Sequence, residues 1–233
     1  MGAVIKRELS GYFSSPIGYI VLAVFYIFSG YYFLVTLLSN ISTLNYVFSS
    51  MFTIVLFLMP ILTMRMWSED KRQKTDQILF TAPVRLLPVP LGKYFAALIV
   101  YTLALCINLV YAIVISFFAA PDWAVFVGNM IGLFLLGAAL IAIGMFISSL
   151  TENQVVAAVG SFAVSLFILL TDTLASVVGV DFISAIIEGL SFNGHYTNFT
   201  SGILDAVDLI FFLSVSVVFI FLTVRVFEKK RWS

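Results

Sequence analysis

No charged residue lies between Glu8 and Arg65, a stretch of 56 positions rich in aromatic and branched aliphatic side chains. A hydrocarbon core of about 30 Å is crossed by roughly 20 helical residues, so this stretch accommodates two membrane spans and a short turn. The rest of the chain is similar, because 62% of its 233 residues are hydrophobic and only 10% are charged. Soluble domains carry about 25% charged residues. The sequence therefore predicts a polytopic membrane protein.

Six runs are long and apolar enough to cross a membrane; four carry no charge, and the last two carry one charge each near their ends, Asp172 and Arg225. Strands of a membrane barrel alternate polar and apolar residues, and these runs do not, so each is predicted to be an α-helix. The expected fold is an all-α, six-span membrane protein that forms a single domain over residues 1–233. The predicted spans are residues 16–38, 46–64, 94–118, 123–150, 155–174 and 209–226.

The positive charges predict the orientation of the spans. All twelve Lys and Arg residues lie before the first span, between the second and third, or near the end of the chain. These three places share one side of a six-span protein, and the positive-inside rule makes that side, with both termini, cytoplasmic. The acidic residues assigned to the opposite side are Asp122, Asp172, Asp181, Glu188, Asp205 and Asp208.

Residues 1–15 precede the first span and have an amphipathic pattern. Ile5, Leu9, Tyr12 and Phe13 would form one apolar stripe on a helix, with Lys6, Arg7 and Ser10 elsewhere on its surface. This pattern favours a short helix that lies in the cytoplasmic membrane interface, and the alternative is a frayed basic tail. Ser15 is a candidate N-cap for a span that Pro16 opens.

The loop of residues 65–93 is predicted to be more ordered than a charged linker. Arg65 and Glu69 lie four residues apart, as do Asp70 and Lys74. Both pairs can meet on a helix that prolongs the second span into the cytoplasm.

A second short helix is predicted farther along this loop. Thr75 is its candidate N-cap, with Asp76 in the first turn, and Pro83 stops it. Such a helix would expose Ile78-Leu79-Phe80, which favours docking of a protein partner. The alternative is a solvated loop whose apolar residues dip into the membrane interface. Pro88 and Pro90 are expected to prevent regular helix before residue 91.

Residues 65–84 read RMWSEDKRQKTDQILFTAPV, and LGK follows at 91–93. This pattern resembles the loop after the second helix in type-two ABC exporter permeases, with Lys74 where that family usually has glycine. Residues 144–157, GMFISSLTENQVVA, are similar to the family's G-L-F-I-S-S-x-T-x-x-Q pattern. Residues 190–205, LSFNGHYTNFTSGILD, are similar to the outer segment of gliding-motility-associated permeases and of their nitrous-oxide-reductase-maturation relatives.

The resemblance implies a permease that pairs with a second, identical or paralogous permease and with two cytoplasmic ATPases, which bind ATP and Mg. In that family the loop after the second span forms a coupling helix in a groove of the ATPase. The turn between the fourth and fifth spans makes a smaller contact with the ATPase. The implied coupling residues are Arg65, Glu69, Asp70, Lys74, Thr75, Asp76, Gln77, Ile78, Leu79, Phe80, Thr151, Glu152 and Asn153.

In the same family the segment equivalent to residues 175–208 partly re-enters the membrane from outside and helps to form a gate. The implied gate residues are Phe192, His195 and Tyr196. The alternative for His195 is an interfacial residue that is hydrogen-bonded within its own loop. An extracytoplasmic auxiliary protein is a further implied partner.

Several motifs of catalytic chemistry are missing from this sequence. It has no G-x-x-x-x-G-K-[ST] P-loop, so we expect a partner to hydrolyse any ATP. It has one histidine and no H-E-x-x-H pattern, and no ionisable group is predicted deep within a span. We therefore expect no catalysis and no cofactor or metal in this chain itself, and no nucleic-acid partner.

Two polar or small-residue features within the spans are predicted to serve packing. Gly128, Gly132 and Gly137 lie in the fourth predicted span and form a small-residue surface for close helix packing, within the chain or across a dimer. Asn108 lies mid-way along the third span, where an interhelical hydrogen bond is expected.

These features predict the membrane subunit of an ATP-driven exporter in a bacterial inner membrane. The first alternative is a mechanotransmission complex of the same architecture, in which ATP hydrolysis drives an extracytoplasmic partner and nothing is transported. The second is a passive channel or structural membrane protein without an ATPase.

Overall fold

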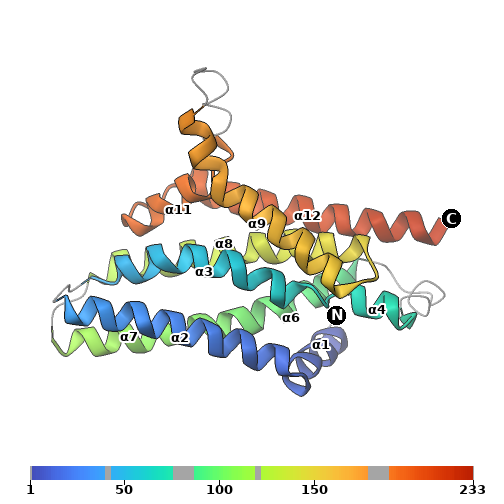
Figure 1. The fold of residues 1–233 in the computed structure, drawn as a ribbon, viewed down its shortest axis with the longest axis horizontal. Helices are drawn as coiled ribbons and strands as arrows, with labels where there is room; N and C mark the ends of the chain where they lie inside the picture. Colours follow the sequence, from blue (N-terminus) through green and yellow to red (C-terminus); the bar gives the residue numbers. More distant parts are fainter. Residues whose placement is uncertain (1, 40–42, 76–86, 119–121, 178–188, 233) are drawn as a thin grey trace.

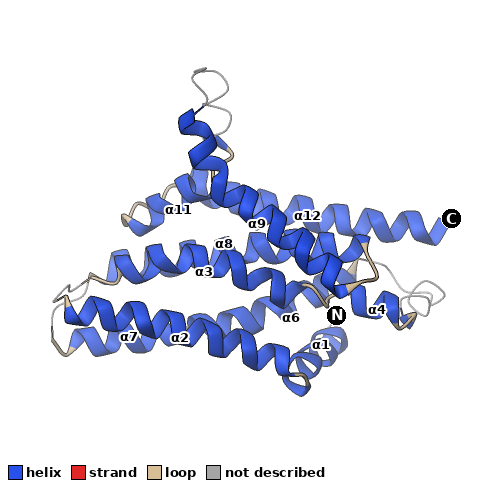
Figure 2. Ribbon diagram, in the orientation of Figure 1, coloured by secondary structure: helices blue, strands red, loops and turns tan. Residues whose placement is uncertain are grey.

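The structure is a computed structural model that describes residues 2–39, 43–75, 87–118, 122–177 and 189–232. Every regular element in these ranges is a helix, and the described residues include no strand (Figure 2). The helices are α1 (Gly2–Ser14), α2 (Pro16–Leu38), α3 (Asn45–Thr63), α4 (Ser68–Arg72), α6 (Pro88–Leu105), α7 (Ile107–Ser116), α8 (Trp123–Leu150), α9 (Gln154–Val177), α11 (Phe192–Thr200) and α12 (Ala206–Trp232) (Figure 1).

Among the described residues, six helical segments are long and apolar enough to span a membrane, which agrees with the predicted number of spans and with the all-helical fold class. Most of their ends lie within a few residues of the predicted ends. The segments are Pro16–Leu38, Asn45–Arg72, Pro88–Ser116, Trp123–Leu150, Gln154–Thr171 and Ala206–Lys229.

The start of the third span differs from the prediction. α6 begins at Pro88, so Pro88 and Pro90 lie in regular helix instead of preventing it. The N–H groups of a first helical turn have no intrahelical acceptor, so a proline at the first or third position removes no hydrogen bond. As a consequence, Lys93 lies in the second turn of a helix and not in a loop.

The predicted amphipathic helix of the N-terminal segment is present as α1, which lies at an angle to the long helices (Figure 1). Its Tyr12 is buried, and the Tyr12 hydroxyl donates a hydrogen bond to the Leu62 carbonyl at 3.3 Å. Ser15 has the extended backbone expected at the start of α2 (φ −103°, ψ 157°), and Pro16 follows it. The Ser15 hydroxyl donates back to the Tyr12 carbonyl at 3.4 Å, so its side chain does not cap α2 as expected.

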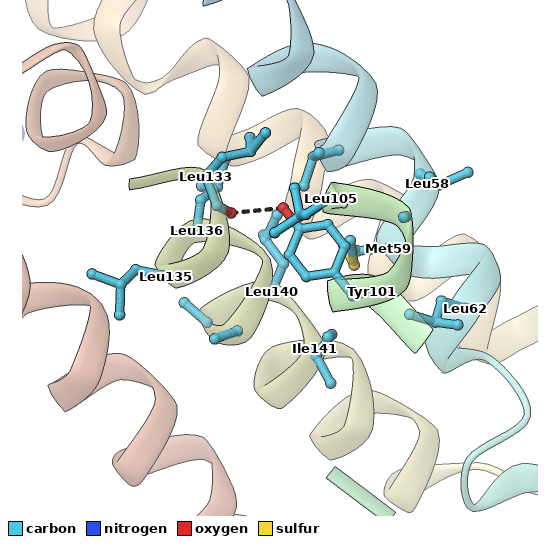
Figure 3. Close-up of a cluster of buried hydrophobic side chains, with 14 of the residues drawn as sticks. Leu58, Met59, Leu62, Tyr101, Leu105, Leu133, Leu135, Leu136, Leu140 and Ile141 are labelled. Atoms are coloured by element: carbon cyan, nitrogen blue, oxygen red, sulfur yellow. Dashed lines mark hydrogen bonds between the residues drawn. The ribbon is translucent and has the colours of Figure 1, made fainter. Parts of the chain in front are cut away.

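α8 is the most buried of the six spanning segments, and it packs against α3, α6, α9, α11 and α12. Glycines allow these close approaches. A Cβ atom on Gly137 would lie 2.0 Å from the Tyr101 ring, and one on Gly132 would lie 2.6 Å from Phe199. Gly128 has room for a Cβ atom, whose nearest neighbour would lie at 3.5 Å. Figure 3 shows Tyr101 between α6 and α8, with its hydroxyl donating to the Leu133 carbonyl at 2.6 Å.

The outer faces of the bundle are apolar. Large hydrophobic side chains such as Ile27 of α2, Phe167 of α9 and Val217 of α12 are exposed. Apolar surface on this scale is stable next to lipid or another protein and not in water. The bundle is therefore built for a bilayer.

Asn108 departs from its prediction. The third span has a break at Cys106, and Asn108 follows this break in α7 with 1% of its surface exposed. Neither amide atom has a hydrogen-bond partner within the part of the chain that the structure describes. The expected interhelical hydrogen bond is therefore absent among the described residues.

Candidate functional site

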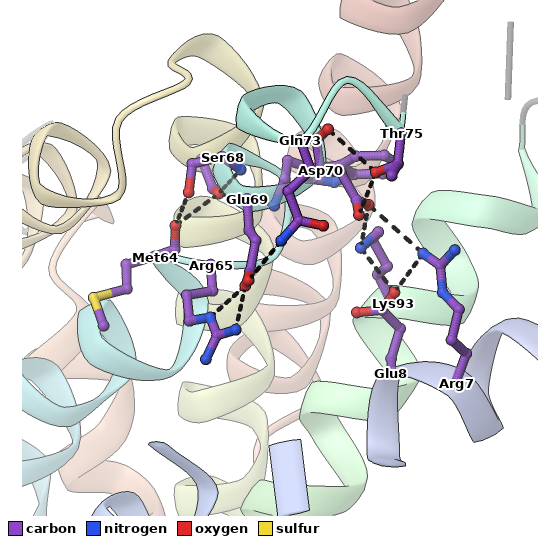
Figure 4. Close-up of polar contacts among 12 residues, drawn as sticks. Arg7, Glu8, Met64, Arg65, Ser68, Glu69, Asp70, Gln73, Thr75 and Lys93 are labelled. Atoms are coloured by element: carbon purple, nitrogen blue, oxygen red, sulfur yellow. Dashed lines mark hydrogen bonds and ion pairs between the residues drawn. The ribbon is translucent and has the colours of Figure 1, made fainter. Parts of the chain in front are cut away.

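Four charged side chains meet at the end of the bundle that carries α1 and α4, and they form the charge cluster of Arg7, Glu8, Asp70 and Lys93 (Figure 4). The Lys93 Nζ atom lies 2.9 Å from Glu8 Oε1 and 2.8 Å from Asp70 Oδ2. The Arg7 guanidinium lies 2.9 Å from Glu8 Oε1 and 3.7 Å from Asp70 Oδ2. Two cations thus face two carboxylates from three helices, namely α1, α4 and α6.

Lys93 is the centre of the charge cluster, because 2% of its side chain is exposed. Its Nζ atom also lies 4.9 Å from the centre of the Trp67 ring, which itself packs against Phe227 of α12. Removal of an ammonium group from water is costly unless opposite charges surround it. The position of Lys93 therefore requires both Glu8 and Asp70 to be in place, which couples three helices through one side chain.

One of the two charge pairs that the sequence predicts forms between the turn before α4 and α4 itself. Arg65 forms the predicted ion pair with Glu69, and Gln73 Nε2 donates to the other Glu69 oxygen at 3.1 Å. Asp70 does not pair with Lys74 but with Lys93 and Arg7. The reason is that α4 ends at Arg72, so Lys74 is outside the helical register that a pair four residues apart needs.

Lys74 has a left-handed backbone conformation with φ 57°, and no other non-glycine residue that the structure describes has a positive φ. This conformation costs a residue with a Cβ atom about 1–2 kcal/mol, and glycine adopts it readily. The next residue, Thr75, turns back towards α4, with its hydroxyl oxygen 3.1 Å from Asp70 Oδ1. The chain therefore makes a tight reversal at the position where the resembled pattern has glycine.

Replacing Lys74 by glycine is expected to stabilise the protein by about 1 kcal/mol, because it removes the strain of the left-handed conformation. The measurement is the apparent melting temperature of the purified protein in detergent. Gln73→Gly is the matched control, since Gln73 has φ −85° and gains nothing from glycine. A Lys74→Gly variant that melts as low as Gln73→Gly would contradict the prediction.

The end of α8 is tied to the same region by hydrogen bonds. The Ser148 hydroxyl oxygen accepts from the backbone N–H groups of Trp67 and Ser68, at 3.0 and 3.1 Å. Lys71 donates to the Ser149 carbonyl. The two bonds to Ser148 satisfy backbone N–H groups at the start of α4, which have no intrahelical acceptor.

The predicted second coupling segment follows directly after these serines. Thr151, Glu152 and Asn153 connect α8 to α9, and the Asn153 side chain accepts from the Val155 N–H at 2.9 Å at the start of α9. Arg65, Glu69, Asp70, Lys74 and Thr75 thus lie at the same end of the bundle as residues 151–153. The remaining predicted coupling residues, Asp76, Gln77, Ile78, Leu79 and Phe80, lie outside the described residues.

The predicted gate residues lie in α11, near the opposite end of the bundle (Figure 1). The His195 Nδ1 atom lies 2.5 Å from Asp208 Oδ1, and Asn198 Nδ2 donates to Asp208 Oδ2 at 2.9 Å. Asp208 is buried at the start of α12, so these contacts fix α11 against that helix. His195 is therefore hydrogen-bonded to the neighbouring helix and not only within its own segment.

The other two predicted gate residues are also anchored. The Phe192 ring packs edge-on against the Phe212 ring of α12, with centroids 5.8 Å apart. The Tyr196 hydroxyl donates to the Phe48 carbonyl of α3 at 2.7 Å. Burial raises the pKa of the Tyr196 hydroxyl, so it stays protonated and keeps donating at physiological pH. α11 is thus fastened to α3 and α12.

Several residues that form these sites were not predicted from the sequence, namely Glu8, Lys93, Trp67, Ser148, Ser149 and Asp208. Glu8 carried a usable signal, because it is the only acidic residue before the first span and lies on the apolar stripe side of α1. Asp208 also carried one, because its partners His195 and Asn198 lie three residues apart and so share a helix face. Lys93 carried none, since its burial depends on helix α6 beginning at Pro88.

This arrangement is that of an all-helical, multi-pass membrane protein. The charge cluster lies at one end of its helix bundle, and the short helix α11 is held by hydrogen bonds near the other end. The sequence matches no protein-family model, and it matches no curated protein.

Proposed function

We propose that this chain is the membrane-spanning permease subunit of an ATP-binding-cassette exporter in a bacterial inner membrane. A cytoplasmic ATPase dimer binds ATP and Mg and hydrolyses ATP, since this chain has no P-loop. A second permease, identical or paralogous, completes the path through the membrane. The charged end of the bundle faces the cytoplasm, as the distribution of Lys and Arg predicts.

The observation that carries the proposal is the position of the charge cluster. Asp70 and Lys93 belong to the helices on either side of residues 76–86, the segment that resembles a coupling helix, and they contact each other at 2.8 Å. Glu8 adds the amphipathic helix α1 to the same cluster at 2.9 Å. A force on the connecting segment therefore acts on three helices together.

The same contacts suggest a route from the ATPase to the membrane. α4 continues the second span, so a displacement of α4 moves α3. Ser148 links α4 to the end of α8, the central helix of the bundle. The energy enters because the ATPase binds the coupling segment differently in its open and closed states.

The test is a charge placed in the predicted docking surface. We expect Leu79→Asp to reduce the recovered ATPase subunit by at least about tenfold, because an unpaired charge in an apolar interface costs more than 1.4 kcal/mol. The tagged chain is purified in mild detergent from membranes of its source organism. Nucleotide-binding subunits are then quantified by mass spectrometry, and ATP hydrolysis is measured.

Leu87→Asp is the matched control, because it makes the same change of side chain at a residue that is 54% exposed and directly precedes α6. It should keep the ATPase subunit and the hydrolysis. Recovery of the unmodified chain without any nucleotide-binding subunit would refute the proposal. So would a Leu79→Asp variant that keeps both the subunit and its coupled hydrolysis.

A further inference from the structure

A cavity of about 90 Å³ lies at the end of the bundle opposite the charge cluster, where the N-terminal ends of α3 and α8 meet α7. Its walls are mostly apolar. Four polar residues also line it, which distinguishes it from an ordinary packing defect. The apolar lining residues are Leu44, Ala112, Ile115, Val125 and Phe126, and the polar ones are Thr43, Asn45, Asp122 and Asn129.

Asn129 is the polar residue deepest in this cavity, with none of its surface exposed. Its Nδ2 atom donates to Asn45 Oδ1 at 3.1 Å. Its Oδ1 atom has no hydrogen-bond partner among the residues that the structure describes. A buried carbonyl oxygen that lines a cavity without a partner calls for a hydrogen-bond donor in that cavity.

Asp122 supplies a negative charge at the same cavity. Its Oδ1 atom accepts from the N–H groups of Ala124 and Val125 at 3.1 and 3.3 Å, so it caps α8. Asp122 and Asn129 are seven residues apart, and two helical turns put them on one face of α8. The capping contacts hold the carboxylate in place and leave lone pairs of its second oxygen for a ligand.

None of the described residues that line this cavity carries a positive charge. No Lys, Arg or His occurs between Arg7 and Arg65 or between Lys93 and His195, and these two stretches contain every lining residue. A cationic group that matches these acceptors therefore comes from outside the lining residues that the structure describes. That group has to donate hydrogen bonds and is favoured by positive charge.

We propose that this cavity binds a primary ammonium group. Such a group has three N–H donors, which match the Asn129 Oδ1 atom, the Asp122 carboxylate and the Thr43 hydroxyl. The carboxylate balances its charge, and the Phe126 ring at the wall favours a cation further. The cavity volume of about 90 Å³ accommodates an aminoethyl group. The inference is independent of the export function.

Two sources present this chemistry to a membrane protein. One is the head group of phosphatidylethanolamine in the surrounding leaflet, and the other is a free primary amine in solution. Nanodiscs separate them. The purified protein, with whatever subunits accompany it, is placed in phosphatidylglycerol discs and titrated with ethanolamine or with choline, whose charged nitrogen has no N–H donor. Parallel discs contain phosphatidylethanolamine or phosphatidylcholine.

We expect phosphatidylethanolamine to raise the melting temperature relative to phosphatidylcholine if the source is lipid. Ethanolamine in phosphatidylglycerol discs should raise it by roughly 5 °C at a hundredfold excess over Kd if the source is a soluble amine. Either result supports the proposal. Equal effects of the methylated and unmethylated compounds in both arms would overturn it, because charge alone or water would then account for the cavity.

Three variants sharpen the test. Asp122→Asn keeps a good helix cap and removes the charge. It should therefore lower the affinity for whichever amine raises the melting temperature by at least about tenfold. Asn129→Asp should raise the affinity for that amine, because it adds a second carboxylate at the base of the cavity. Asp205→Asn is the control, since Asp205 Oδ1 caps the start of α12 in the same way, with Val207 N–H at 3.1 Å. An Asp122→Asn variant that binds as well as Asp205→Asn would overturn the proposal.

Discussion

Lys93→Met is expected to destabilise the protein by about 3–5 kcal/mol, since it removes one partner of a buried set of charges. Glu8 and Asp70 keep 17% and 15% of their side chains exposed, and the Lys93 ammonium lies within 2.9 Å of both. Methionine preserves most of the packing volume and removes the charge. The apparent melting temperature should fall by roughly 10 °C. Size-exclusion chromatography after a temperature series measures the remaining folded protein.

Two controls identify the cause of this loss. Lys6→Met makes the same change at an exposed position of α1, and it should change stability by less than about 0.5 kcal/mol. Adding Glu8→Gln and Asp70→Asn to Lys93→Met should recover much of the loss, because no uncompensated carboxylate remains. If Lys93→Met melts at the same temperature as Lys6→Met, the charge cluster does not hold the three helices together.

The spans could be predicted because their signal is local and long. Each is an apolar run of about the length that crosses a bilayer, with at most one charge near its end, and no tertiary information is needed to find it. The Arg65–Glu69 pair was predictable for the same reason, since four residues on one helix suffice to bring the two side chains together. Pro16 at the start of α2 likewise follows from the fixed φ of proline.

The charge cluster could not be predicted, because its contacts join residues far apart in the sequence. The sequence suggests Lys74 as a local partner of Asp70. That pair does not form, because α4 ends at Arg72 and the chain reverses at Lys74. Its actual partner, Lys93, looked like a loop residue because two prolines precede it. Only the start of α6 at Pro88 brings Lys93 to a position between α1 and α4.

Lys74 is unusual both in its residue type and in its backbone conformation. The resembled pattern has glycine at this position, and a lysine there suggests a stiffer elbow. The structure gives Lys74 a left-handed conformation, which glycine adopts without strain. The sequence could indicate an unusual residue at that point but not the conformation that makes it unusual.

Gly137→Ala is the second change with a large expected effect. The new Cβ atom would lie 2.0 Å from Cε1 and 2.4 Å from Cζ of Tyr101, closer than non-bonded atoms can approach. The Tyr101 ring cannot withdraw freely, because its hydroxyl donates to the Leu133 carbonyl at 2.6 Å and no part of its surface is exposed. Overpacking and the loss of this bond together should cost about 3 kcal/mol.

A series of glycine variants along α8 separates packing within the chain from packing between two copies. Gly132→Ala should cost less than Gly137→Ala, and Gly128→Ala should be neutral or stabilising, because its Cβ has no neighbour closer than 3.5 Å. Tyr101→Leu should relieve Gly137→Ala in the double variant, since it removes the colliding ring atoms. Melting temperatures in detergent that follow this order place the glycine surface inside one chain. If Gly137→Ala instead changed the oligomeric state and left melting unaltered, a contact between two copies of this chain would explain the glycines.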